Sequence, residues 1–340
     1  MREFTPFMLS LSKHVPTLVR RSGSKPFSLR AATILFFLMS SSCSTVAPAG
    51  DTNRLRQTAD LIEEVKAFGK TIGIEPTEAL RRTSQGGPSL AMLWLWMQKE
   101  GTLALRGPVD IRLAIGLNVD KEAPKVEQVY RVDGYSVYHR QGSEFADPRS
   151  VATAGFAEEA LVRRAKVILH EDLHGDVNFE LAWEIEEAIV TPLGSLAVIE
   201  YLRHKGDEKN LSNALASLAE ERAVSRELLA LVDEAQRIFA KEKVDDAKQR
   251  ILDKLANYSN YQRQFERQTR EQHSPTVLEA KLSHDLAYYR YFDAIAALAE
   301  KGPSLRTLIE DLKKLPKESG HEALERYLRE LDGKYGMAQK

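Results

Sequence analysis

The chain has 340 residues, of which 43% are hydrophobic and 29% are charged, and its formal net charge is -1. This composition is typical of a globular protein with a sizeable core. The near-zero net charge and the lack of a basic stripe argue against a nucleic-acid partner. A single cysteine excludes a disulfide within the chain.

Residues 1–43 resemble a bacterial lipoprotein signal peptide. Basic residues precede the apolar stretch Ala31–Met39, which is too short to span a bilayer. The small residues Ser40–Ser42 then lead to Cys43, which stands where lipoproteins carry their lipid. Such signals usually have leucine where Ser40 stands. A plain secretory signal, cleaved near Ala47–Ala49, is the alternative.

The same segment predicts the location of the protein. Lipidation of Cys43 would anchor the chain in the bacterial cell envelope, facing the periplasm, with residues 44–53 as a tether. Ser44 in place of aspartate after the cysteine resembles the signal for the outer membrane. Met1 and Met8 are both candidate starts. Residues 54–340 are then expected to form the folded domain.

The first part of this domain mixes helix and strand. Apolar residues at helical spacing predict a helix over about 54–84, which Gln85–Pro88 interrupts. The apolar run Leu90–Met97, with its two tryptophans, is expected to be buried. Residues 103–138 have β character, because apolar residues alternate with others and β-branched and aromatic residues are frequent. A small sheet of two to four strands is therefore expected.

The most informative stretch is His170-Glu171-Asp172-Leu173-His174, an H-E-x-x-H motif. On a helix, residues four apart lie on one face, so His170 and His174 can bind one metal ion. Glu171 can then reach a water molecule in an open coordination position, as in zinc hydrolases. The alternative is a solvated helix with two incidental histidines. Chance would give this motif in roughly 2% of chains of this composition.

A second helix is expected to supply a third ligand. Gly175 ends the first helix, Asp176–Asn178 offers a turn and an N-cap, and a helix follows from about Phe179. Residues at i, i+4, i+7 and i+11 share one face of this helix: Glu180, Glu184, Glu187 and Thr191. The metzincin pattern with a third histidine is absent, so a carboxylate is expected. Spacing alone leaves Glu184 and Glu187 open.

From residue 207 to 340 the chain is predicted to be helical almost throughout. Pro275 interrupts this pattern, and the charge-rich stretches 241–248 and 263–272 are expected to be solvated. The predicted class is α+β and predominantly α-helical. It has a small β-sheet beside a zincin-type active-site helix pair, followed by a C-terminal helical region.

Four stretches resemble successive motifs of a known family: Gly142–Pro148, the H-E-x-x-H motif, Glu186–Val190, and Ala280–Leu282 with Tyr288. The family is one of bacterial zinc aminopeptidases, gluzincin-like proteins that are often lipoproteins. Glu186–Val190 keeps only the glutamate of the family's Asn-Glu-Ser-Phe segment, and Leu278-Glu279 replaces its Asn pair. The resemblance covers the larger part of the mature chain.

This resemblance implies a zinc ion held by His170, His174 and Glu187. Glu171 would act as general base, taking a proton from the attacking water and delivering it to the leaving amine. Gluzincins usually add a tyrosine or histidine that donates to the developing oxyanion. Tyr288 is the candidate here, and His284, one turn earlier, is the alternative.

The leading hypothesis is therefore a lipid-anchored zinc aminopeptidase with a peptide substrate and an undetermined oligomeric state. An aminopeptidase needs a carboxylate for the free α-amine, and Glu184 and Asp176 are candidates. Asp176 could instead be an N-cap, and Glu184 could hydrogen-bond a zinc-bound histidine. The competing hypothesis is a non-catalytic helical lipoprotein that binds or scaffolds a partner in the envelope.

Overall fold

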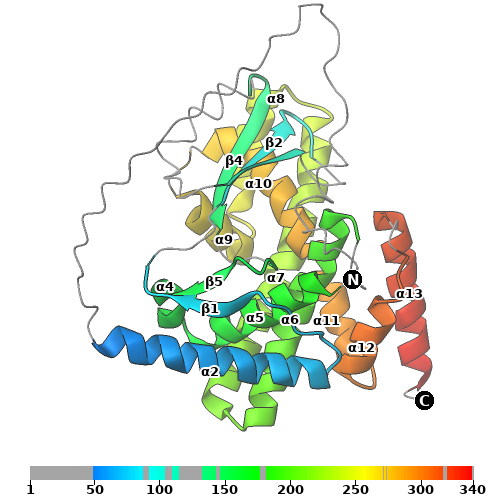
Figure 1. The fold of residues 1–340 in the computed structure, drawn as a ribbon. Coiled ribbons are helices and arrows are strands. Elements are labelled where there is room, and N and C mark those ends of the chain that lie inside the picture. The colour runs from blue at the N-terminus through cyan, green and yellow to red at the C-terminus, as the bar shows by residue number, and fades with distance from the viewer. Residues whose placement is uncertain are drawn as a thin grey trace, which may run out of the picture.

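Helices make up most of the computed structural model (Figure 1), with two small sheets beside them. The predominantly α-helical α+β class predicted from the sequence is therefore confirmed. The structure describes residues 49–86, 92–103, 109–114, 132–142, 146–176, 181–270, 272, 274–316 and 320–338. The expected signal peptide and Cys43 lie outside these residues. None of the described helices has the length and apolarity needed to cross a membrane.

The first helix, α2 (Ala49–Thr71), is shorter at its C-terminal end than the sequence pattern suggested. The prediction of a helix over 54–84 was wrong beyond residue 71, because Gly73 adopts the left-handed conformation (φ 89°) and turns the chain. The strand β1 (Leu80–Ser84) follows and pairs in parallel with β5 (Val151–Thr153). Figure 1 shows α2, in blue, lying along these two strands.

The second sheet is antiparallel, and its described strands have the order β3-β2-β4. The apolar run at 90–97 supplies its central strand, β2 (Met92–Lys99), and Trp96 is fully buried. The flanking strands are β3 (Val109–Ala114) and β4 (Tyr135–Gly142). Three described strands agree with the expected two to four. The sheet packs on helix α10 through β2 and β4.

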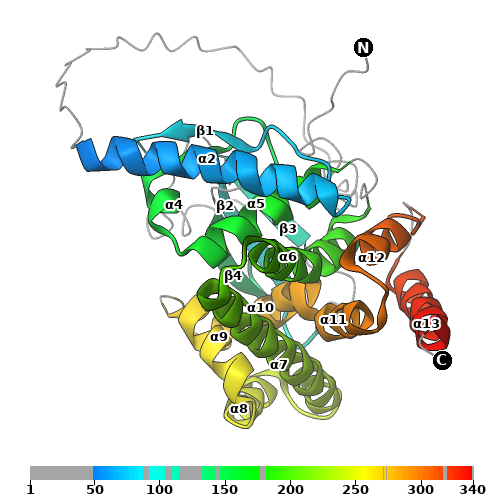
Figure 2. The ribbon, with the colours of Figure 1, turned by 90° about the horizontal axis from the view of Figure 1, so that it is seen from below.

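Three helices follow β5 directly: α4 (Ala154–Glu158), α5 (Leu161–Gly175) and α6 (Trp183–Lys205). Helix α6 is buried on nearly every side, and α5, α7, α10 and α11 surround it (Figure 2). It begins at Trp183 with Ala182 as N-cap. The expected capping role of Asp176 is therefore wrong, since Asp176 follows the end of α5 as its C-cap.

The predicted helical region after residue 207 is confirmed. Its helices are α7 (Glu208–Phe239), α8 (Val244–Leu255), α9 (Ser259–Thr269), α10 (Ser274–Tyr289), α11 (Phe292–Lys301), α12 (Leu305–Leu312) and α13 (His321–Ala338). Pro275 lies in the first turn of α10, where a missing N–H costs little. The stretch 263–272 falls largely within α9, whose outer face is exposed.

Two hydrophobic clusters organise these elements. The first joins α2, α5 and α6 to the C-terminal helices α11, α12 and α13. The second lies between the three-stranded sheet and helices α7 to α10. Helix α6 links the two, because Trp183 at its start packs in the second cluster while the rest of the helix belongs to the first. Both clusters therefore contact helix α6.

Candidate metal centre

Helix α5 presents His170 and His174 one turn apart on the same face, as the motif predicted. The residue between them, Asp172, points elsewhere and forms a buried ion pair with Lys66 of α2. Its Oδ1 also accepts hydrogen bonds from the backbone N (3.0 Å) and Oγ1 (2.7 Å) of Thr77. These contacts fix the rotation of α5 about its axis, which directs both imidazoles toward α6.

Helix α6 brings Glu187 to the two imidazoles. The Nε2 atoms of His170 and His174 are 3.1 Å apart, and Oε2 of Glu187 lies 3.7 Å from the first and 3.4 Å from the second. A tetrahedral ion with bonds of about 2.0–2.1 Å separates its ligand atoms by about 3.4 Å. The three atoms therefore fit one metal ion, and two imidazoles with one carboxylate form a donor set that suits zinc.

A glycine on α6 allows this close approach. A Cβ atom on Gly194 would lie 3.3 Å from Cβ of His170, tighter than an ordinary packing contact. Because His170 lies opposite Gly194 while His174 lies opposite Glu187, the two helices run antiparallel. The register at which they cross places Glu187 beside the two imidazoles.

Glu186, the residue before the third ligand, orients His174. Its Oε1 lies 2.7 Å from Nδ1 of His174, so we assign a ring proton to Nδ1, and a metal ion would displace the proton on Nε2. Burial alone lowers the pKa of His174, but the negative charges of Glu187 and Glu186 outweigh it and raise this pKa well above its usual value. The two carboxylates thus create a negative potential that attracts a cation.

The other two ligands have the protonation states that metal binding requires. Burial lowers the pKa of His170 to about 3, so its ring is neutral at pH 7. Burial raises the pKa of Glu187, but the positive charge of His174 outweighs it and brings this pKa to about 2. The side chains of His170, His174 and Glu187 are 18%, 6% and 7% exposed, so this face of α5 is not the solvated surface of the alternative interpretation.

The other candidate carboxylates of the described residues do not belong to the three-residue group, and Glu180 lies outside the described residues. Glu171 is half-buried on α5, beside the two histidines in sequence. Glu184 is half-buried in the first turn of α6 and does not belong to the three-ligand group. Asp176 is buried and ion-paired with Lys313, which ties the end of α5 to the segment after α12. Asp176 is therefore a structural residue and is not free to bind a substrate amine.

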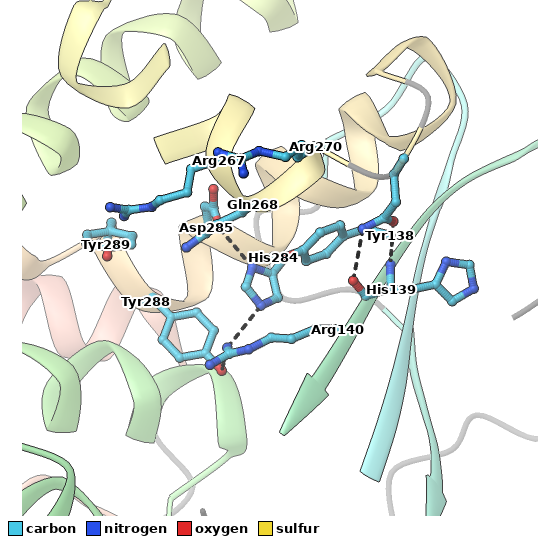
Figure 3. A pocket seen from close by; sticks show the side chains of 11 residues that line it. Tyr138, His139, Arg140, Arg267, Gln268, Arg270, His284, Asp285, Tyr288 and Tyr289 are labelled. Atoms are coloured by element: carbon cyan, nitrogen blue, oxygen red, sulfur yellow. Dashed lines mark hydrogen bonds and ion pairs between the residues drawn. The ribbon is translucent and has the colours of Figure 1, made fainter. Parts of the chain in front are cut away.

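Strand β4 and helix α10 lie near the centre, because the charge of Glu187 acts on Arg140 of β4 and on Tyr288 of α10. Figure 3 shows these two side chains beside His284. Arg140 of β4 donates from Nη1 to the hydroxyl of Tyr288 at 3.1 Å, and the same atom lies 3.5 Å from Nε2 of His284. Nδ1 of His284 bonds to Oδ1 of Asp285 at 2.8 Å. Burial lowers the pKa of His284 to about 4, so the neutral ring donates to Asp285 and accepts from Arg140.

The hydrogen bonds of Tyr288 and His284 differ in what they leave available for a further partner. Both ring nitrogens of His284 are engaged, whereas the hydroxyl of Tyr288 accepts from Arg140 and keeps its own proton for another acceptor. Burial, and then the negative charges of Glu187 and Glu171, raise the pKa of Tyr288 above its usual range, so the phenol stays protonated. Because the charges of both glutamates act on Tyr288, its phenol lies within electrostatic range of the candidate metal centre.

Sequence analysis did not find two residues of this region. Glu186 was counted among the glutamates of the second helix but given no role, because it lies off the face shared by Glu184 and Glu187. Its position next to a candidate ligand in the sequence was the feature that could have indicated its role. Arg140 lies in a strand far from the motif in sequence, and the signal was a charged residue within a largely uncharged strand, Tyr135–Gly142.

Comparisons of the chain with protein-family profiles, with curated proteins and with solved structures returned no match.

Proposed function

We propose that the chain is a zinc-dependent metallopeptidase in which His170, His174 and Glu187 hold the metal and Glu171 is the general base. The observation that carries this proposal is the geometry of the three ligand atoms, which lie 3.1–3.7 Å apart in a largely buried site. Three protein ligands leave a fourth position open, as catalytic zinc sites require. Glu171 follows the first ligand directly, on the same helix.

The proposed reaction distributes its steps among these residues. A bound zinc ion would lower the pKa of a water molecule and polarise the peptide carbonyl. Glu171 takes the proton as this water attacks, and then delivers it to the leaving amine. Tyr288 donates its phenol proton in a hydrogen bond to the carbonyl oxygen as negative charge develops there. Arg140 strengthens this donor by holding the phenol oxygen in a charge-assisted hydrogen bond.

Two features favour catalysis over a binding or scaffolding role. A non-catalytic module needs neither a buried carboxylate next to two histidines nor a glutamate directly after the first of them, and this site has both. In addition, a protonated phenol lies within electrostatic range of Glu187 and Glu171. The three groups together supply the ligand, base and oxyanion donor that hydrolysis of an amide bond requires.

The cellular setting is part of the same proposal. The apolar stretch before Cys43 supports lipid anchoring in the bacterial envelope, with the domain facing the periplasm. The resemblance to zinc aminopeptidases supports a peptide substrate with a free α-amine. Glu184, in the turn of α6 before Glu187, is the remaining candidate for binding that amine.

Hydrolysis of peptides by the purified, zinc-loaded chain tests the proposed function. Peptides with free and with acetylated N-termini are incubated with the protein, and the products are identified by mass spectrometry. We expect cleavage that a zinc chelator abolishes and added zinc restores. Cleavage that survives complete removal of the metal would contradict the proposal. No cleavage by zinc-loaded protein would favour the non-catalytic alternative.

Replacing Tyr288 by phenylalanine should lower kcat by about 10²–10³ while zinc stays bound, because a donor to the developing oxyanion is lost. KM should change little, since this hydrogen bond strengthens only in the transition state. The matched control is Tyr291→Phe, which removes a hydroxyl bonded to Glu325 of helix α13. Equal kcat values for Tyr288→Phe and the wild type would remove Tyr288 from the mechanism.

A further inference from the structure

A polar cavity of about 540 Å³ lies between strand β4 and helices α9 and α10 (Figure 3). Its walls come from strand β4, helix α9 and helix α10, which are distant in sequence. Arg140 and Tyr288, the two residues on which the charge of Glu187 acts, line this cavity. A volume of this size accommodates a few residues of a peptide or a small organic molecule. These two residues therefore connect the cavity electrostatically to the candidate metal centre.

Three arginines give this cavity its charge. Arg140 projects from β4, and Arg267 and Arg270 project from the C-terminal end of α9. All three side chains are exposed to solvent, and none of them forms an ion pair with a carboxylate of the described residues. Arg140 bonds only to neutral partners there, the phenol of Tyr288 and the ring of His284.

The carboxylate in the wall of the cavity, Asp285, does not neutralise these arginines. Asp285 is buried and ion-paired with Lys281. It also accepts hydrogen bonds from the hydroxyl of Tyr261 at 2.9 Å and from Nδ1 of His284 at 2.8 Å. Its charge is therefore balanced within the protein. The accessible surface of the cavity keeps an excess of positive charge from the three guanidinium groups.

We propose that this cavity binds a carboxylate of the peptide substrate, either the C-terminal carboxylate or the side chain of an acidic residue close to the cleaved bond. Guanidinium groups bind carboxylates by paired, charge-assisted hydrogen bonds, which uncharged peptide groups cannot match. Arg140 lines the cavity and interacts electrostatically with Glu187, so a bound carboxylate would lie near the proposed site of hydrolysis. The placement of the scissile bond rests on the proposed function, whereas the binding of a carboxylate does not.

Binding to the Glu171→Gln variant separates recognition from catalysis. Isothermal titration calorimetry compares three kinds of peptide built on one sequence. The first is capped and uncharged, and the second is the same peptide with a free C-terminal carboxylate. The third kind is the capped peptide with one glutamine at a time replaced by glutamate. We expect at least one carboxylate peptide to bind about tenfold more tightly than the uncharged one. The second peptide alone would identify the C-terminus as the source, and the third alone an acidic side chain.

The double variant Arg267→Gln/Arg270→Gln, made in the same background, tests the site itself. Both side chains are exposed, so the fold should be unaffected. The preference for the carboxylate peptide should fall severalfold, whereas the control Arg263→Gln, an exposed arginine of the same helix, should retain it. Equal affinity for all three peptides, or a preference unchanged in the double variant, would overturn the proposal. A carboxylate preference in a protein that never cleaves peptides would instead refute only the proposed function.

Discussion

Replacing Glu171 by glutamine should reduce kcat for peptide hydrolysis by about 10²–10⁴, because the variant loses the group that accepts the proton of the attacking water. Zinc should remain bound, since Glu171 is not one of the three ligand residues. The measurement is kcat for a peptide that the wild type cleaves, together with the zinc content of both proteins. Retained metal with lost turnover is the result that identifies a base rather than a ligand.

The control for this variant is Glu159→Gln. Glu159 is an exposed glutamate just before α5 and carries no proposed role in the site. Its replacement should leave kcat within twofold of the wild type, because isolated surface substitutions have small effects. A Glu171→Gln protein that turns over at nearly the wild-type rate would refute the assignment of the base, even if the metal site is correct.

Replacing Lys66 by methionine should lower the free energy of unfolding by about 3–5 kcal/mol, because Asp172 would be left as a buried, uncompensated charge. The pair is 2% and 1% exposed and joins α2 to the helix that carries the metal motif. Burial opposes the charged form of both partners, lowering the pKa of Lys66 and raising that of Asp172. Denaturant-induced unfolding followed by circular dichroism measures the change.

Lys70→Met is the matched control, since Lys70 lies one turn further along α2 and is exposed. Its effect on the free energy of unfolding should stay within about 0.5 kcal/mol. If Lys66→Met were no more destabilising than Lys70→Met, the buried pair would contribute little, and the rotation of α5 would have to be fixed by its apolar packing.

The local part of the metal site could be predicted from the sequence, because it lies within one helix. His170 and His174 share a face whatever the tertiary structure, provided that α5 forms. The choice between Glu184 and Glu187 is different. Both occupy one face of α6, and only the crossing of the two helices, with Gly194 against His170, decides which one reaches the imidazoles. Spacing left that choice open, and the family resemblance favoured Glu187.

Contacts between residues far apart in the sequence could not be predicted either, because they depend on how the elements pack together. Arg140 meets Tyr288 and His284 only after β4 has packed on α10, over a separation of more than a hundred residues. Periodicity describes what one element presents to its surroundings and does not indicate its partner. Glu186 contacts His174 because the end of α5 lies against the start of α6, so two adjacent positions face one imidazole.

The errors in secondary structure have local causes. The helix predicted over 54–84 ignored Gly73 and Pro76, both recognised stop signals after a helical pattern. The apolar run that became β2 was assigned no element, since a short buried strand and a buried helical segment have the same hydrophobicity. The long C-terminal helices were predicted well because their apolar residues recur over many turns.

The zinc content of the purified chain, measured beside His174→Ala, Glu187→Ala and Glu184→Ala, tests the metal centre most directly. The geometry predicts about one zinc per chain in the wild type and in Glu184→Ala, and only traces in His174→Ala and Glu187→Ala. A wild-type protein that takes up no zinc would contradict this account. So would a Glu187→Ala protein that retains the metal while Glu184→Ala loses it.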